Sequence, residues 1–180
     1  MAQTVWLVDD NSPATAPTGQ GSWSNAFQDP QDAFDGAVTG DTILIAEGSY
    51  SPDPAGTTNI VGIDTPSGTT ITGRHHSFVV KVPVTVIGGF VGYTPSGTSS
   101  TNPLLPDGLV SKTILHGDFL NTPADPFDNS HHVVHVDGSL SSQFSIRTVE
   151  LQRMIIRDGN TYLSQASSSY EPVRLGAGIH

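Results

Sequence analysis

The chain has 180 residues, a formal net charge of −10 and only seven Lys and Arg residues. So few cationic side chains cannot neutralise a phosphate backbone, which excludes nucleic acid as a partner. The absence of cysteine excludes disulfides, thiolate metal sites and thiol chemistry. Because no stretch approaches the ~20 apolar residues of a membrane span, we expect no membrane insertion.

The amino-terminal part of the chain predicts a strand followed by an aromatic loop. Thr4 to Val8 is a β-branched and aromatic run, and the Asp-rich, Pro-containing segment 9–13 after it favours a turn. Trp23 and Phe27 follow in a loop, where their rings could cover the edge of a core. The first ten residues lack the basic and apolar regions of a signal peptide, so either the protein stays inside the cell or its signal has been removed, and we favour removal.

One short helix is predicted next. Asp29 is the expected N-cap and Pro30 the first helical residue, where its missing N–H costs nothing. Four apolar side chains then fall at helical spacing on one face: Ala33, Phe34, Ala37 and Val38. We expect Gly40 to end this helix and residues 42–46 to form a strand.

From residue 43 onward, short apolar runs alternate with loops of very unequal length. The runs are 43–46, 77–82, 85–89, 113–117, 132–137 and 149–156, and the long polar loops are 51–73 and 93–111. The later runs recur every roughly twenty to thirty residues, which is typical of a solenoid. Hairpin-linked sandwiches prefer short connections, so the loops favour stacked coils over a sandwich.

Several segments, in this order, resemble the amino-terminal region of large bacterial right-handed β-helix repeat proteins, which are pectin-lyase-like and similar to polymorphic outer-membrane proteins. The similar segments are 5–10, 22–27, 31–34, 40–43, 46–50, 77–80, 86–90, 113–118, 128–134, 156–160 and 176–179. The resemblance implies an all-β fold: a right-handed parallel β-helix (solenoid) with an N-terminal cap containing one short α-helix. It also implies an extracellular or bacterial cell-surface location.

The expected organisation is a cap over residues 1–41 and β-helix coils over residues 42–180. Residues 177–180 read as the opening of a further strand, so we expect a chain truncated at its carboxyl end. An open coil exposes apolar interior and an unpaired strand edge, which would allow head-to-tail self-association. Within the coils, Gly88 and Gly89 are expected at tight corners, and Leu151, Met154 and Ile156 inside.

Histidines form the sharpest local pattern. His131, His132 and His135 make an HHxxH motif on a predicted strand, where His131 and His135 would share a face. Four residues of strand separate them by ~13 Å, too far for one metal ion to bind both. A metal site would therefore need His116 or Asp118 from an adjacent coil, and we favour histidines packed in a stack.

Calcium is the better metal candidate, although the spacing matches no EF-hand. The loops of this acidic chain offer hard oxygen ligands in Asp125, Asp128, Asn129 and Asp137. An ordinary turn rich in Asp and Asn explains the same residues, and we favour it. We expect no other cofactor.

Polysaccharide cleavage on such a fold needs a base near carboxylates. The candidates are Arg153 and Arg157 with Asp118, Glu150 and Asp158. An exterior ion pair between Arg157 and Asp158 is the simpler interpretation, so we assign no catalytic residue.

The sequence therefore favours a noncatalytic surface module for adhesion, glycan contact or assembly, with an extracellular glycan or cell-surface protein as its partner. One alternative is a polysaccharide lyase or glycoside hydrolase. A second is a structural protein that stacks head to tail.

Overall fold

The computed structural model describes residues 3–52, 76–95, 112–120, 129–136 and 148–159. These residues fold as two compact units, each made from distant parts of the sequence. Unit 1 contains the described parts of Met1–Tyr50, Val80–Leu115 and Val136–Ile155. Unit 2 contains those of Ser51–Val79, His116–His135 and Ile156–His180.

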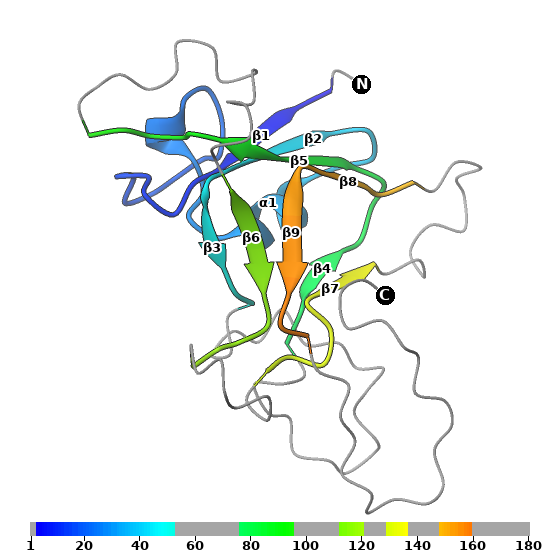
Figure 1. Cartoon of the computed structure of the whole chain (residues 1–180). Helices are drawn as coiled ribbons and strands as arrows, with labels where there is room; N and C mark the ends of the chain where they lie inside the picture. The colour runs from blue at the N-terminus through cyan, green and yellow to red at the C-terminus, as the bar shows by residue number, and fades with distance from the viewer. Residues whose placement is uncertain (1–2, 53–75, 96–111, 121–128, 137–147, 160–180) are drawn as a thin grey trace, which may run out of the picture. The chain divides into compact units, whose positions relative to one another are not determined.

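Unit 1 is built on a four-stranded parallel sheet (Figure 1). Its strands, in spatial order, are β1 (Val5–Val8), β2 (Thr42–Ala46), β5 (Thr85–Phe90) and β8 (Glu150–Gln152). Leu7 pairs with Leu44, Leu44 with Ile87, and Ile87 with Gln152. The apolar side chains of Leu7, Leu44 and Ile87 therefore stand in one row on one face of the sheet, and Gln152 continues this row in β8.

Two smaller sheets complete the described structure. One contains β3 (Gly48–Tyr50), β6 (Thr113–His116) and β9 (Met154–Arg157). The other pairs β4 (Phe78–Val80) with β7 (Val134–Val136). Every strand pair with a defined register is parallel. The protein is thus mostly strands in parallel sheets with one short helix, as the sequence predicts at this coarser level.

The helix α1 (Pro30–Gly36) begins as predicted, because Asp29 caps it and its carboxylate accepts the backbone N–H of Gln31 at 2.8 Å. The predicted end at Gly40 and the buried position of Val38 are wrong. The Asp41 carboxylate accepts the N–H of Val38 at 3.0 Å, which ties this segment into a turn after the helix. Val38 is consequently 50% exposed, while Ala33, Phe34 and Ala37 are buried.

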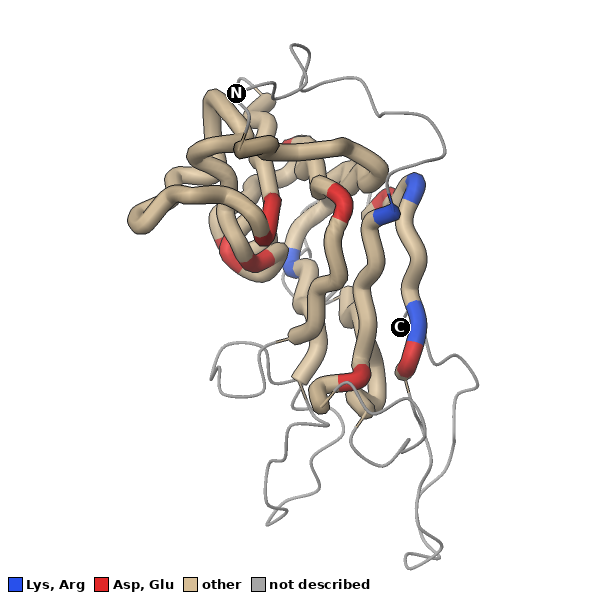
Figure 2. The backbone as a smooth tube through the Cα atoms, turned by 60° about the vertical axis from the view of Figure 1, so that its left-hand side comes forward, with Lys and Arg blue, Asp and Glu red and all other residues tan. Residues whose placement is uncertain are grey.

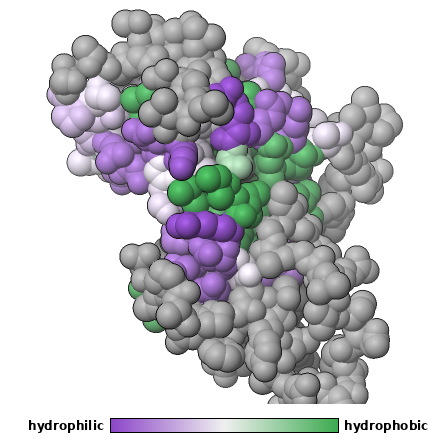
Figure 3. Space-filling view, in the orientation of Figure 1, coloured by the Kyte–Doolittle hydropathy of each residue, from purple (hydrophilic) through white to green (hydrophobic). Residues whose placement is uncertain are grey.

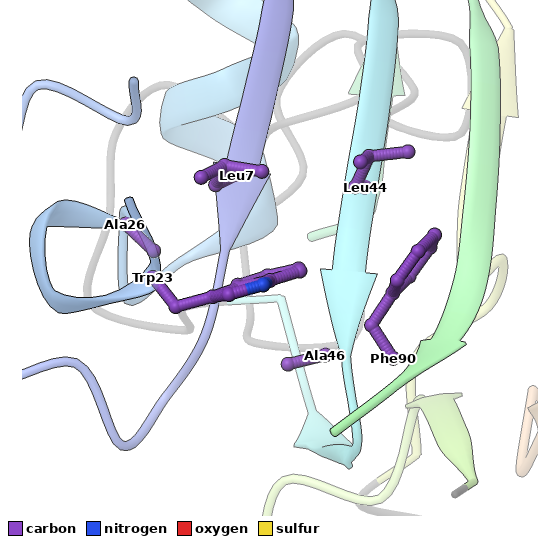
Figure 4. Packing of buried hydrophobic residues seen from close by; sticks show 6 residues of the cluster. All are labelled: Leu7, Trp23, Ala26, Leu44, Ala46 and Phe90. Atoms are coloured by element: carbon purple, nitrogen blue, oxygen red, sulfur yellow. The ribbon is translucent and has the colours of Figure 1, made fainter. Parts of the chain in front are cut away.

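An apolar cluster packs against one face of the four-stranded sheet (Figure 4). Trp23 comes from a 3-10 turn, η1 (Trp23–Asn25), and its ring centre lies 5.7 Å from that of Phe90. The buried members are Leu7, Trp23, Ala26, Leu44, Ala46 and Phe90. The expectation that Trp23 covers a core is confirmed, and Phe27 stacks on Trp6 with 5.9 Å between ring centres.

The outer edge of β1 is covered by residues 19–27. Leu7 donates its N–H to the carbonyl oxygen of Gly19 at 2.8 Å, and Phe27 donates to the carbonyl of Leu7 at 2.9 Å. Asp9 in turn donates to the carbonyl of Phe27 at 2.7 Å. Backbone groups that a further strand would need are therefore already bonded.

Thr113 ties β2, β5 and β6 together inside unit 1. Its fully buried hydroxyl accepts the N–H of Gly89 at 2.9 Å and lies 2.8 Å from the carbonyl oxygen of Ala46. Close packing continues at Gly88, where an added Cβ would lie 2.7 Å from the carbonyl oxygen of Arg153 and 2.8 Å from Cβ of Thr113. Gly88 and Gly89 lie inside β5, so the tight corner predicted at these glycines is wrong.

Other strand predictions need correction. The run 149–156 is two strands, because Arg153 adopts a φ of +56° between β8 and β9. Strand β3, which the sequence analysis missed, is short and begins with Gly48. Leu151, Met154 and Ile156 are half-buried, which agrees with their predicted inward side. Within the described ranges, no helix is both long and apolar enough to cross a bilayer.

Candidate functional site

Polar side chains of unit 2 gather where three segments run side by side. Gly117 donates its N–H to the carbonyl oxygen of Arg157 at 3.1 Å and accepts the N–H of Ser130 at 2.7 Å. Asp118 and Asn129 form an antiparallel bridge next to these bonds. Segments 116–118, 129–130 and 157–158 therefore form the backbone of one site, which we call the histidine–acid site.

Gly117 allows these segments to come so close. A Cβ at this position would lie 2.5 Å from the carbonyl oxygen of Asp158 and 3.0 Å from Cβ of Ser130. Real Cβ atoms do not approach backbone that closely, so any larger residue would push the segments apart. The histidine–acid site thus depends on a glycine at its centre.

The imidazole of His116 is a titratable group of this site. Partial burial lowers the pKa of His116 below its ordinary value of 6.5, and this effect outweighs the nearby carboxylates of Asp118 and Asp158, which raise it. The Arg157 guanidinium also lowers this pKa. His116 is therefore mainly neutral at pH 7, and a neutral imidazole can both donate and accept a hydrogen bond.

Arg157 and Asp158 form the exterior ion pair that the sequence predicts. Nε of Arg157 lies 3.1 Å from Oδ2 of Asp158, and both side chains are exposed to solvent. Asp158 adopts a left-handed backbone with a φ of +62°, a conformation that Asp tolerates better than most residues. An exposed pair of this kind contributes little to stability, so both groups can turn toward a bound molecule at small cost.

Buried hydroxyl groups hold the neighbouring backbone of unit 2 in place. The Ser130 hydroxyl lies 2.5 Å from the carbonyl oxygen of His76 and 2.6 Å from that of His132, and Ser130 is fully buried. Ser77 donates its hydroxyl hydrogen to the same His132 carbonyl at 2.5 Å. Two buried atoms, Oδ1 of Asn129 and Nδ1 of His76, have no hydrogen-bond partner within the described ranges.

The histidine prediction is only partly right. Strand β7 begins at Val134, so His131 and His132 precede the strand, and only His135 lies on it. The proposed face shared by His131 and His135 is therefore wrong, because period-two alternation does not extend to His131. Among the residues that the structure describes, no three His, Asp or Glu side chains are grouped so that they could hold a metal ion.

The other predicted residues fall in different places. Asp118, Arg157 and Asp158 lie in unit 2, whereas Glu150 and Arg153 lie in unit 1, so the five do not form one site within a unit. Of the calcium candidates, Asn129 contributes to the histidine–acid site. Asp125, Asp128 and Asp137 lie outside the described residues.

Sequence reasoning missed a second group of acidic residues, in unit 1. Asp9 and Asp10 follow β1, and Glu47 follows β2, at the same end of a parallel sheet. The predicted turn at Asp9 and Asp10 is correct but incomplete. The available signal was that the carboxyl ends of parallel strands meet at one edge of a sheet.

Chemically, the histidine–acid site combines carboxylates, an amide, a guanidinium and a neutral imidazole. Such a set can donate hydrogen bonds to and accept them from hydroxyl groups, and His116 can accept a proton.

In comparisons with other proteins, the chain matches no family, no curated protein and no solved structure.

Proposed function

We propose that the chain is part of a right-handed parallel β-helix and serves as a noncatalytic extracellular or cell-surface module for adhesion, glycan contact or assembly. The observation that carries this proposal is the order in which the chain visits its sheets. Strands β2, β3 and β4 lie in three different sheets, β5, β6 and β7 return to them in the same order, and β8 and β9 begin a third round.

A repeated order of this kind is what a coiled chain produces. Each round adds one parallel strand to every sheet, and the connections leave from the corners, where long loops do not disturb the pairing. The continuous row of Leu7, Leu44 and Ile87 supports the same interpretation, because successive coils place equivalent residues above one another. A crystal structure with hairpin-linked antiparallel strands would contradict the fold proposal.

Two surfaces support a binding function. A hydrophobic area lies in the region of β6 and β9 in Figure 3, where Ile155 is 43% exposed and Ile114 is half-buried. The histidine–acid site offers hydrogen-bonding groups of the kind that recognise sugar hydroxyls.

Affinity electrophoresis against a panel of neutral and uronate polysaccharides tests this function. We expect retardation of the native chain by at least one polymer, and weaker retardation of Arg157→Ala, which removes the exposed guanidinium. Lys81→Ala is the matched control, because it removes an exposed cation paired with Asp35 in unit 1. Equal retardation of both variants would remove the histidine–acid site from the proposal, and no retardation by any polymer would count against glycan contact.

A carbohydrate-active enzyme is the second candidate, favoured by the influence of the Asp118 and Asp158 charges on His116. A lyase or hydrolase would release unsaturated or reducing ends from the same polysaccharides. The assay is run with and without Ca²⁺, because the Asp and Asn side chains of the loops make calcium the candidate metal. Release that His116→Gln abolishes would support the enzyme, and absence of release across the panel would leave the binding module.

Assembly through strand edges is restricted by the covered edge of β1. Backbone groups of Leu7 and Asp9 are bonded to residues 19 and 27, so a second copy cannot pair with β1 without displacing them. Gly19→Ala would push on the Phe27 ring, since a Cβ there would lie 3.0 Å from its Cζ atom. Gly21→Ala is the matched control, with a positive φ but no neighbour within 4 Å. Light scattering that increases only for Gly19→Ala would show that this cover limits association.

A further inference from the structure

The carboxylate of Asp9 connects the end of β1 to the segment after β5 through hydrogen bonds. Asp9 is 1% exposed and accepts the N–H of Asn11 at 2.9 Å and the N–H of Tyr93, 84 residues further along the chain. The segment 91–93 follows β5, and Gly92 faces the carboxylate with a φ of +79°. A Cβ at Gly92 would also lie 2.6 Å from Cβ of Ala46, so the contact requires glycine.

Three acidic groups and two tyrosines meet at this junction. Asp10 lies beside Asp9, Glu47 follows β2, Tyr50 comes from β3, and Tyr93 follows β5. The Tyr50 hydroxyl donates to the carbonyl oxygen of Ala46 at 3.3 Å. Figure 2 shows acidic positions in this part of the chain, and within the described ranges no Lys, Arg or His pairs with Asp9, Asp10 or Glu47.

A buried carboxylate without a counter-charge is costly when ionised, and nearby carboxylates add repulsion. Two N–H donors offset part of this cost, because they favour the ionised form. Uptake of one proton removes both the repulsion and much of the desolvation cost, while a neutral carboxyl oxygen can still accept a hydrogen bond.

We propose that Asp9 is a proton-operated lock: when it takes up a proton, the segment after β5 is held more tightly to the end of β1. The pKa of Asp9 is raised above its ordinary value of 3.8, chiefly by burial, and the charges of Asp10 and Glu47 contribute. Burial likewise raises the pKa of Asp10. A group whose folded-state pKa is raised stabilises the closed state as the pH falls through that pKa, and this stabilisation is lost as the pH rises.

Hydrogen exchange at the Tyr93 amide measures the lock directly in the full chain. After correction for the intrinsic exchange rate, protection should rise between pH 7 and pH 4, about tenfold for each unit by which the closed-state pKa of Asp9 exceeds the open-state value. Asp9→Asn should abolish this rise. Asp35→Asn, on the exposed side of α1, is the matched control and should keep it. Protection that is constant or falls on acidification would overturn the proposal.

A second measurement covers the case in which Asp9→Asn fails to fold. The Asp9 carboxyl carbon is titrated by NMR in the native chain, where a midpoint above 3.8 supports the lock. Glu47→Gln should lower that midpoint, because it removes a repelling charge without touching the hydrogen bonds of Asp9. A midpoint at or below 3.8 in the native chain would overturn the proposal.

Discussion

In unit 1 the buried side chains are mainly apolar, whereas in unit 2 many of them carry hydroxyl, imidazole or carboxyl groups. The first arrangement is represented by Trp23, which packs on Phe90 in the cluster of Figure 4. The second is represented by Ser130, which bonds the backbone of His76 and His132. Neighbouring strands can therefore be held by apolar area or by side chain to backbone hydrogen bonds, and the two respond differently to mutation and to pH.

The largest expected effect is on the apolar side of this comparison. Trp23→Ala should lower the free energy of unfolding by about 3–5 kcal/mol, because it empties a fully packed site. Trp23→Phe should cost much less, since Nε1 of Trp23 is buried without a hydrogen-bond partner in the described structure. Urea denaturation measures both. A loss below about 1 kcal/mol for Trp23→Ala would show that this cluster does not carry the stability of unit 1.

Removal of one hydroxyl tests the polar side. Ser130→Ala should cost about 1–3 kcal/mol, because the carbonyl oxygen of His76 loses its hydroxyl donor beside a fully buried residue. Ser24→Ala, whose hydroxyl is exposed, should change stability by less than about 0.5 kcal/mol. Equal effects of the two substitutions in urea denaturation would mean that the buried hydroxyl is not a structural element of unit 2.

Acidification should change the local stability of the two units in opposite directions. His116 has a lowered pKa, so its contribution to stability is present above 6.5 and is lost as the pH falls through its folded-state value. The raised pKa of Asp9 has the opposite effect, because acidification then stabilises the contact between the segment after β5 and the end of β1. Amide exchange near Gly117 should therefore accelerate on acidification, after correction for intrinsic rates, while exchange at Tyr93 slows. His116→Gln should remove the pH dependence of exchange near Gly117 and leave that at Tyr93. Any other pattern would contradict the opposite pH responses of the two units.

The smallest expected effect concerns the corner between β8 and β9. Arg153 has a φ of +56°, which favours Asn or Gly over Arg. Arg153→Asn should raise the free energy of unfolding by about 0.5 kcal/mol. Gln152→Asn, one residue earlier in β8, should lower it, because Asn is a poor strand former. Thermal unfolding of the two variants, compared in one buffer, gives the sign of each change.

Much of the local structure could be predicted because it depends on neighbouring residues. Asp29 and Pro30 specify the start of α1, and β-branched runs specify strands such as β2 and β5. The errors come from contacts that propensity and spacing do not reveal. The helical spacing of apolar residues continues to Val38, but the Asp41 carboxylate three residues later accepts the N–H of Val38, and β3 forms through its pairing with the distant strand β6.

The candidate sites follow the same rule. The ion pair of Arg157 and Asp158 could be predicted because the two residues are adjacent. The grouping of His116 with Asp158 depends on which strands pair, and the bond from Tyr93 to Asp9 joins residues 84 positions apart. Only the pairing of strands, which the local pattern does not encode, brings such groups together.

The hydroxyl of Thr113 has a mechanical consequence. It joins the backbone of Gly89 in β5 to the carbonyl oxygens of Ile45 and Ala46 in β2, while its own strand lies in another sheet. A force that pulls on β6 would therefore load β2 and β5 at the same moment. We therefore expect these strands to separate together rather than one after another when the chain is stretched.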